Sequence, residues 1–237
     1  MPILDDLLSL ISPNSCYGCD RDGSLLCYNC QNKLLNDHLK EKSRCIVCYR
    51  SSPTLKNICS ICHNKLKLSD IYFVSYYQDV IKKLVWDLKF NSKISAAKTA
   101  ANLIGVKLNS LKSESLIIIP LPTAPKRVRA RGYDQAQQIA KNIVKLNHNW
   151  ELKNLLIRSS DIDQIGRSKT DRQSTSKNMF FINPTIKLNS LKNCHLILID
   201  DVMTTGSTIG AASKLLYGAG FNNISAATLA YQPRNKP

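Results

Sequence analysis

Hydrophobic residues after position 66 alternate between short continuous runs and helical periods. Residues 71–77 (IYFVSYY) combine aromatic and β-branched side chains, which is typical of a strand. Residues 79–90 carry Val, Ile and Leu at helical spacing, and residues 94–106 form a second helical stretch that is rich in Ala. We therefore expect a strand followed by two helices, and then a polar loop over 105–115.

The rest of the chain continues this alternation. Strands are predicted at 116–120, 196–200 and 224–231, and helices at 136–146 and 208–216. The runs LIIIP and LILID are apolar almost throughout, as expected for parallel strands that are buried on both faces. The pattern predicts an α/β domain whose parallel twisted sheet is flanked by helices, with functional groups at the carboxyl ends of the strands.

The first 66 residues differ, and the polar run 63–70 marks the expected boundary between a 1–66 module and a 67–237 domain. The sequence MPILDDLLSLIS places its leucines on one helical face, which predicts a short amphipathic helix. It has two acidic residues and no basic flank, so it does not resemble a secretory signal. No stretch reaches about 18 apolar residues, so we expect no transmembrane segment and a cytoplasmic location.

Eight of the nine cysteines fall into four C-x-x-C pairs within the first 62 residues. Each pair presents two thiolates from one tight turn, and two pairs complete a tetrahedral zinc site with four cysteine ligands. We therefore expect two structural Zn²⁺ ions in a double zinc ribbon; an iron–sulfur cluster, a redox dithiol and a disulfide framework are less favoured. The predicted ligands are Cys16, Cys19, Cys27, Cys30, Cys45, Cys48, Cys59 and Cys62.

The segments 16–30 and 45–62 form an imperfect repeat, CYGC…CYNC and CIVC…CSIC. Sequential pairing gives one zinc ion per repeat and is weakly favoured by loop-closure entropy, while an interleaved cross-brace stays open. His63 is either a substitute ligand or, as we favour, a surface histidine. Cys194 precedes a predicted buried strand, so we expect it to be a small core residue.

Charge and composition narrow the function only slightly. The chain has 43% hydrophobic and 21% charged residues, which is a globular composition and excludes a disordered tail protein. Lys and Arg number 33 against 17 for Asp and Glu, so the net charge is +16. Such an excess attracts nucleic acid, acidic lipid or phosphate-rich ligands, but solubility alone also accounts for it.

The sequence LILIDDVMTTGSTIG (196–210) joins a buried strand to two adjacent carboxylates, a short polar loop and a helix. The glycine lets the backbone approach a ligand, and the N–H groups beyond it lie at the positive end of the helix. No Lys follows the glycine, which excludes the P-loop of NTPases. Asp200 and Asp201 suit a sugar diol, so the stretch predicts a ribose 5-phosphate site. The phosphate cradle comprises Thr204, Thr205, Gly206, Ser207 and Thr208.

This stretch resembles the PRPP-binding signature of type I phosphoribosyltransferases, in which a hydrophobic strand is followed by Asp-Asp and T-T-G-x-T. Residues 117–140 resemble the P-x-P and basic R-G-[FY]-[ND]-Q elements of the ComF family, residues 87–90 its L-K-F element, and residues 164–181 its Q-x-G-x-S stretch. A double zinc ribbon followed by a transferase domain is the layout of that family. Asp134 and Thr175 depart from its pattern, because Asn is usual at both.

The resemblance implies that a nucleophile displaces pyrophosphate from PRPP bound with Mg²⁺. Asp200 and Asp201 would be the catalytic pair that holds the ribose hydroxyls, directly or through Mg²⁺. The loop 121–131 would face the pyrophosphate, and the stretch 164–181 would cover the site. Pyrophosphate, or alternatively a DNA backbone, would contact Lys126, Arg127, Arg129 and Arg131, with Tyr133 available for base stacking.

The ComF resemblance also implies a role in DNA uptake during natural competence. The protein would handle single-stranded DNA in the cytoplasm, alongside an uptake helicase or channel component, and this is our first hypothesis, with PRPP or nucleotide binding retained. The alternative is an active Mg²⁺-dependent phosphoribosyltransferase with an unknown acceptor. A third hypothesis is an adaptor that binds PRPP without turnover and docks partners through the zinc ribbon.

Overall fold

The computed structural model describes residues 14–36, 44–51, 56–91, 93–111, 115–158 and 179–233. The predicted amino-terminal helix lies outside these ranges. The predicted cover over 164–181 also lies outside them, except for its last three residues, of which Phe180 and Phe181 belong to a short strand.

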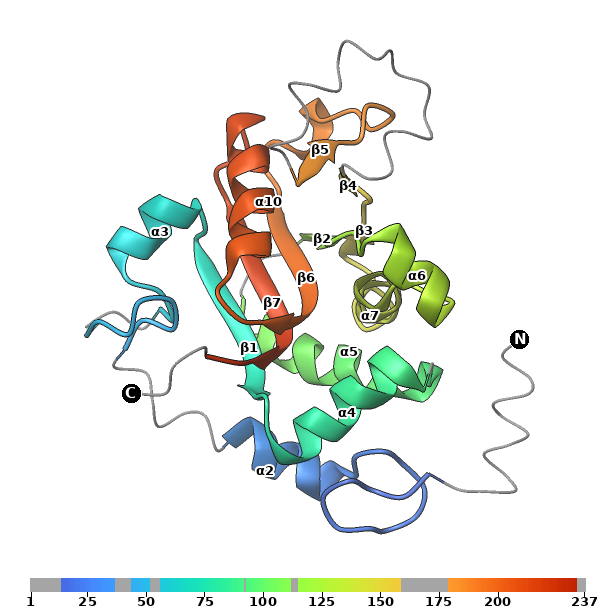
Figure 1. Cartoon of the computed structure of the whole chain (residues 1–237). Coiled ribbons are helices and arrows are strands. Elements are labelled where there is room, and N and C mark those ends of the chain that lie inside the picture. The colour runs from blue at the N-terminus through green and yellow to red at the C-terminus, as the bar shows by residue number, and fades with distance from the viewer. Residues whose placement is uncertain are drawn as a thin grey trace.

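A five-stranded sheet with the order β1-β7-β6-β2-β3 forms the centre of the molecule, and every neighbouring pair is parallel (Figure 1). Its strands are β1 (Asp70–Tyr76), β2 (Leu116–Pro120), β3 (Trp150–Leu152), β6 (His195–Met203) and β7 (Ile224–Tyr231). All eight residues of β7 are buried, because helices cover both faces of the sheet. The α/β architecture predicted from the alternating pattern is confirmed.

Successive side chains of the central strands enter two separate cores, one on each face. Ile197 and Ile199 of β6 lie in one core, whereas Leu196 and Leu198 lie in the other. The first core receives α4 (Asp79–Phe90), α5 (Ile94–Leu108) and α7 (Gln135–Ile143). The second receives α10 (Ser207–Gly218). An antiparallel pair, β4 (Leu156–Arg158) and β5 (Phe180–Ile182), lies to the right of the upper end of α10 in Figure 1.

Element bounds differ from the sequence prediction at several helix and strand ends. The stretch predicted as the loop 121–131 contains a helix, α6 (Pro125–Arg131), so that part of the prediction is wrong. Its sequence PKRVRAR lacks apolar periodicity, but Pro125 is preorganised for a first helical turn. α5 runs on to Leu108, and β6 continues through the two carboxylates to Met203. None of the helices in the described ranges is long and apolar enough to cross a bilayer.

The two cysteine-rich segments pack on opposite faces of the sheet. Cys16 belongs to the core of α4 and α5, and α2 (Tyr28–Asn36) lies below α4 in Figure 1. Cys62, on α3 (Ser60–Leu66), belongs to the core of α10. The hydroxyl of Ser213 on α10 donates to the carbonyl of Leu66. The boundary near residue 66 stays a prediction, but each segment is fastened to the α/β domain by such contacts.

Candidate metal centres and strand-end site

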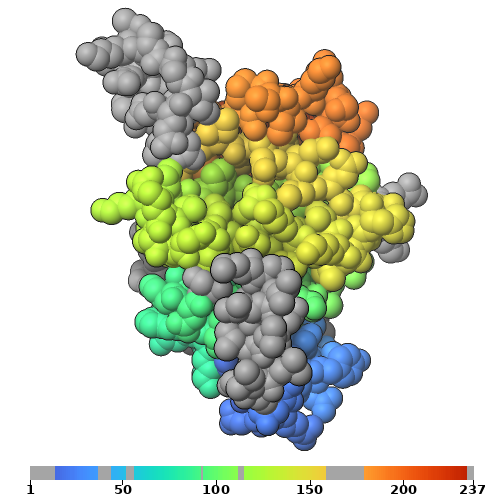
Figure 2. All heavy atoms as spheres, turned by 90° about the vertical axis from the view of Figure 1, so that its right-hand side faces the viewer, coloured from blue at the N-terminus to red at the C-terminus, as the bar shows by residue number. Residues whose placement is uncertain are grey.

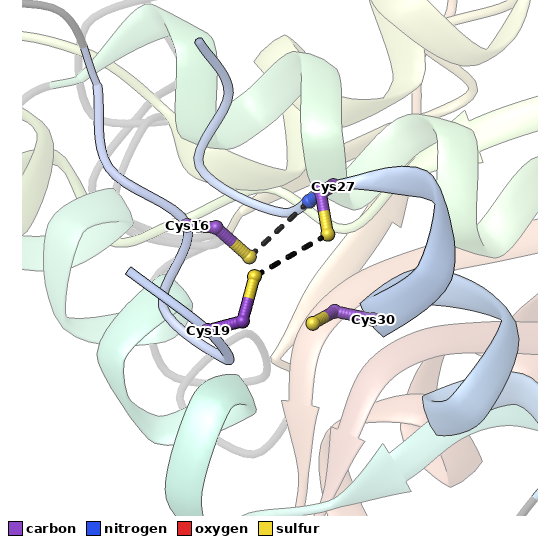
Figure 3. Close-up of side chains that lie close together, drawn as sticks. All are labelled: Cys16, Cys19, Cys27 and Cys30. Atoms are coloured by element: carbon purple, nitrogen blue, oxygen red, sulfur yellow. Dashed lines mark hydrogen bonds between the residues drawn. The ribbon is translucent and has the colours of Figure 1, made fainter. Parts of the chain in front are cut away.

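Cluster A comprises Cys16, Cys19, Cys27 and Cys30. Their side chains converge from one loop and from the start of α2 (Figure 3). The four Sγ atoms lie within 4.8 Å of one another, and Cys19 Sγ is 3.7 Å from Cys27 Sγ. A zinc tetrahedron with Zn–S bonds of about 2.3 Å places sulfurs about 3.8 Å apart. The cluster therefore fits a zinc ion, which would crosslink the loop to the start of α2.

Cluster B comprises Cys45, Cys48, Cys59 and Cys62, and it repeats the local geometry of cluster A. The four Sγ atoms again lie within 4.8 Å, with Cys48 and Cys59 Sγ 3.6 Å apart. Each first knuckle closes with the same backbone bond, from Asp20 N–H to Cys16 O and from Tyr49 N–H to Cys45 O, both 2.8 Å. Pairing is therefore sequential rather than interleaved. His63 is exposed outside the cluster, as favoured from the sequence.

Backbone N–H groups prepare one sulfur in each cluster to bind a metal. Burial alone raises the pKa of Cys16, but N–H groups of Cys27, Gly18 and Cys19 outweigh it and lower that pKa to about 6. The Cys27 N–H lies 3.3 Å from Cys16 Sγ. A bond from the Cys62 N–H lowers the pKa of Cys59 to about 7. Thiolates are the ligating form, so these contacts favour metal capture at neutral pH.

The predicted acid pair lies near the carboxyl end of β6. Asp200 and Asp201 are half-buried, and Asp201 Oδ2 forms an ion pair with Lys89 Nζ of α4 at 3.3 Å. Burial, reinforced by the adjacent charge of Asp201, raises the pKa of Asp200 to about 8. Burial therefore favours the neutral form of Asp200, whereas a bound cation or bound hydroxyl donors would stabilise its charged form. The ion pair from Lys89 is a contact that the sequence did not predict.

The predicted phosphate loop follows directly and leads into α10. Gly206 is the residue before the helix and has φ +70°, a left-handed conformation that favours glycine. Thr204, Thr205 and Ser207 are exposed, and the Ser207 N–H points toward Thr205 Oγ1 at 3.4 Å. The first N–H groups of this twelve-residue helix therefore lie beside exposed hydroxyls. This arrangement can accept an oxyanion at the positive end of the helix.

Replacing Gly206 by alanine should weaken both folding and anion binding. The left-handed backbone costs a Cβ-bearing residue about 1–2 kcal/mol, although the added Cβ finds Met203 Sδ only at 3.7 Å. Thermal denaturation and phosphate titration measure the two losses. Gly218→Ala is the matched control, because Gly218 ends the helix that follows Gly206, has open space around an added Cβ and lacks a positive φ. Equal stability of the two variants would contradict the assigned strain.

The basic stretch predicted to face pyrophosphate forms α6. Its predicted cations are Lys126, Arg127 and Arg129, which are exposed, and Arg131, which is half-buried. Arg131 Nη1 donates to Gln135 Oε1 at 2.9 Å. Tyr133 is half-buried, and its hydroxyl donates to the Leu88 carbonyl on α4. Tyr133 therefore joins α4 to the segment after α6, which makes it a poorer base-stacking surface than the sequence suggested.

Tyr133, in the segment after α6, lies within electrostatic reach of both α6 and the acid pair. Burial raises the pKa of Tyr133, and the charges of Arg131 and Asp201 both act on its phenol. Asp134 caps α7 by accepting the Gln137 N–H at 3.1 Å, and it also accepts the Thr123 N–H at 2.7 Å. Asp134, where the ComF pattern usually has Asn, thus serves as the N-cap of α7.

Cys194 is partly buried and packs against the core that contains α10, which is close to the role of a small core residue expected for it.

Comparison with known proteins gives a consistent picture. The family described as "Phosphoribosyl transferase domain" matches residues 129–237. "Competence protein F" of Haemophilus influenzae is 26% identical over 218 residues, covering 84% of this chain and 93% of that protein. "Competence protein ComFC" of Bacillus subtilis is 27% identical, covering 82% and 79%. "DNA utilization protein YhgH" of Escherichia coli K12 is 24% identical, covering 82% and 92%.

Proposed function

We propose that this chain is a ComF-family protein that binds single-stranded DNA during DNA uptake and holds PRPP or a related nucleotide in the strand-end site, which comprises Asp200, Asp201 and the loop 204–208. Binding takes place in the cytoplasm, where an uptake helicase or channel component delivers the strand. The names of the relatives support the competence context, and the match to a phosphoribosyl transferase domain supports a nucleotide ligand.

The observation that carries the nucleotide part is the order of groups along β6 and after it. Asp200 and Asp201 lie near the end of the strand, and the loop 204–208 then opens α10. A ribose 5-phosphate has the same order, with its diol at one end and its phosphate at the other. In this arrangement the acid pair binds the hydroxyls, directly or through a Mg²⁺ ion that it would hold and that would offset the pyrophosphate charge, and the loop binds the 5′-phosphate.

The basic helix α6 carries the polynucleotide part. Lys126, Arg127 and Arg129 are exposed within one turn of the helix, and α6 adjoins the surface of α4 in Figure 2. Within α6 there is no acidic residue to neutralise them. Exposed cations of this kind bind phosphates of any sequence, and their counterion release makes the affinity fall with salt.

The metallated protein should bind a labelled single-stranded oligonucleotide in fluorescence anisotropy, with an affinity that falls as NaCl rises from about 50 to 200 mM. Replacing Lys126, Arg127 and Arg129 by alanine should make the salt slope shallower by about 0.7 for each phosphate that is no longer neutralised. A charge-matched control replaces Lys98, Lys145 and Lys214, which are exposed on α5, in the turn after α7 and on α10. Absent or salt-independent binding would overturn the DNA part.

Adding Mg²⁺ and PRPP to the same titration shows whether the oligonucleotide and PRPP compete for the strand-end site. Displacement of the oligonucleotide by PRPP means that the strand enters the strand-end site itself. Retention of the oligonucleotide places it on α6 and α4, outside that site. PRPP binding is measured separately by calorimetry, so the nucleotide part stands or falls on its own.

The second candidate is catalysis by the same site, as an Mg²⁺-dependent phosphoribosyltransferase. The raised pKa of Asp200 favours it, because perturbed carboxyls concentrate at reactive sites. The reaction would break the bond between the anomeric carbon and pyrophosphate and form one to an acceptor. Pyrophosphate release in an acceptor screen tests it. Tight PRPP binding without release would instead favour the adaptor hypothesis.

A further inference from the structure

Helix α4 exposes two aromatic side chains that no core receives. Trp86 is 53% exposed and Phe90 is 60% exposed, although the opposite face of the helix is fully buried through Ile81, Leu84 and Val85. The two aromatic residues are one helical turn apart, and their ring centroids lie 4.4 Å apart at an interplanar angle of 42°. They form a continuous aromatic surface, and exposed apolar surface of this kind marks an interaction site.

Positive charges surround this aromatic pair. Lys82 and Lys89 lie four residues before and three residues after Trp86, on the same side of the helix. Lys93 follows Phe90 by three residues and pairs with a buried carboxylate of α4 at 3.0 Å. Besides that buried carboxylate, α4 carries acid only in its first turn. Its outer face therefore suits a ligand that is both anionic and aromatic.

The aromatic pair adjoins the strand-end site through the same helix. Lys89 immediately precedes Phe90 and pairs with Asp201 at 3.3 Å. The carbonyl of Leu88 accepts a hydrogen bond from Tyr133, next to the basic helix α6. Figure 1 shows α4 running below α6, so the two basic elements border one side of the molecule. A strand bound along α6 can therefore continue over α4.

We infer that Trp86 and Phe90 form a base-stacking platform for single-stranded nucleic acid. This inference rests on the proposed function and assigns the surface that receives the bases. Unpaired bases offer free faces to aromatic rings, whereas bases within a duplex do not. Lysines around the rings contact the phosphates, so binding is independent of sequence. A free nucleotide can cover one ring, but a strand can place successive bases on both.

Tryptophan fluorescence reports the platform directly, because the chain has two tryptophans and Trp150 is only 5% exposed. Titration with an oligothymidylate of about 15 nucleotides should quench Trp86 at the same concentrations at which anisotropy reports binding. Trp86→Ala/Phe90→Ala should weaken affinity about ten- to a hundredfold, at an unchanged salt slope. Trp86→Phe should keep most of the affinity and lose most of the quenching. PRPP binding should be unchanged in all these variants.

Tyr217→Ala is the matched control, since Tyr217 is an exposed aromatic beside Lys67 on another helix, and its loss should leave DNA binding unchanged. If the wild type binds the strand and the double variant binds it equally well, the platform is overturned while the proposed DNA binding stands. Oligonucleotide binding without quenching of Trp86 would also overturn the platform. The aromatic pair would then be a candidate contact surface for a protein partner. If the wild type binds no strand, both proposals fail.

Discussion

Cys16→Ser and Cys45→Ser should each remove one of the two bound zinc ions and unfold the segment that holds that ion. These are the two fully buried thiols of their clusters, and serine lacks a thiolate. Apparent zinc-binding energies of about 10–16 kcal/mol in small zinc modules rival the whole stability of a domain. Cluster A and cluster B contact different faces of the sheet, so we expect the two losses to be independent.

Metal content per chain by mass spectrometry, together with hydrogen exchange of the two segments, measures this effect. The wild type should hold two zinc ions and each variant one, with exchange accelerated only around the altered cluster. Cys194→Ser is the control, because Cys194 lies in neither cluster and should leave both ions bound. Loss of both ions from a single substitution would show that the clusters are coupled.

Asp200→Asn should make the protein more stable and weaken its binding of PRPP. Burial and the charge of Asp201 raise the pKa of Asp200 to about 8 in the folded chain, against about 4 in an unfolded one. The carboxyl therefore contributes most to stability at low pH, and that contribution is lost as the pH rises toward 8. Asparagine avoids this cost, so the gain in stability should be absent near pH 4 and largest near pH 8.

We expect a gain of about 1–2 kcal/mol at pH 8, smaller than the full pKa shift would give because Asp200 is only half-buried and solvent screens its charge; this is several degrees in Tm for a chain of this size. PRPP affinity should fall about ten- to a hundredfold, as when a charged hydrogen-bond acceptor is removed. Asp201→Asn is the informative comparison: it also removes a carboxylate from the site, but it leaves Lys89 without its ion-pair partner and should not stabilise the fold. Thermal melts across pH and calorimetry measure both effects. Unchanged PRPP affinity in both variants would show that the ligand binds elsewhere.

Four of the five strands of the sheet, and the helices that cover it, were predictable because their signals are local, whereas the three-residue edge strand β3 was not predicted. The runs 116–120 and 224–231 coincide with β2 and β7, and the helix over 79–90 coincides with α4. The cysteine ligands followed from spacing in the same way. Helix α6 was missed because its seven residues bury no side chain fully, so no periodic pattern marks it.

Contacts between distant elements could not be predicted from the sequence. Nothing near Lys89 in the chain indicates that it reaches Asp201, since this pair depends on how α4 packs against β6. The aromatic pair on α4 did leave a signal. Trp86 and Phe90 fall outside the apolar phase of Ile81, Leu84 and Leu88, so the pattern alone places them on the outer face.

The segment that holds cluster B also covers part of an edge of the sheet. β1 is an outermost strand, and the side-chain amide of Asn57 donates to its Ile71 carbonyl at 2.9 Å. The Asn57 N–H, two residues before Cys59, donates to the Asp70 carboxylate at 3.0 Å. A chain that loses this metal bares backbone acceptors on a hydrophobic strand, which is a template for pairing with another chain. Loss of zinc from cluster B would then lead to self-association of the protein at β1, in addition to unfolding of the cysteine-rich segment.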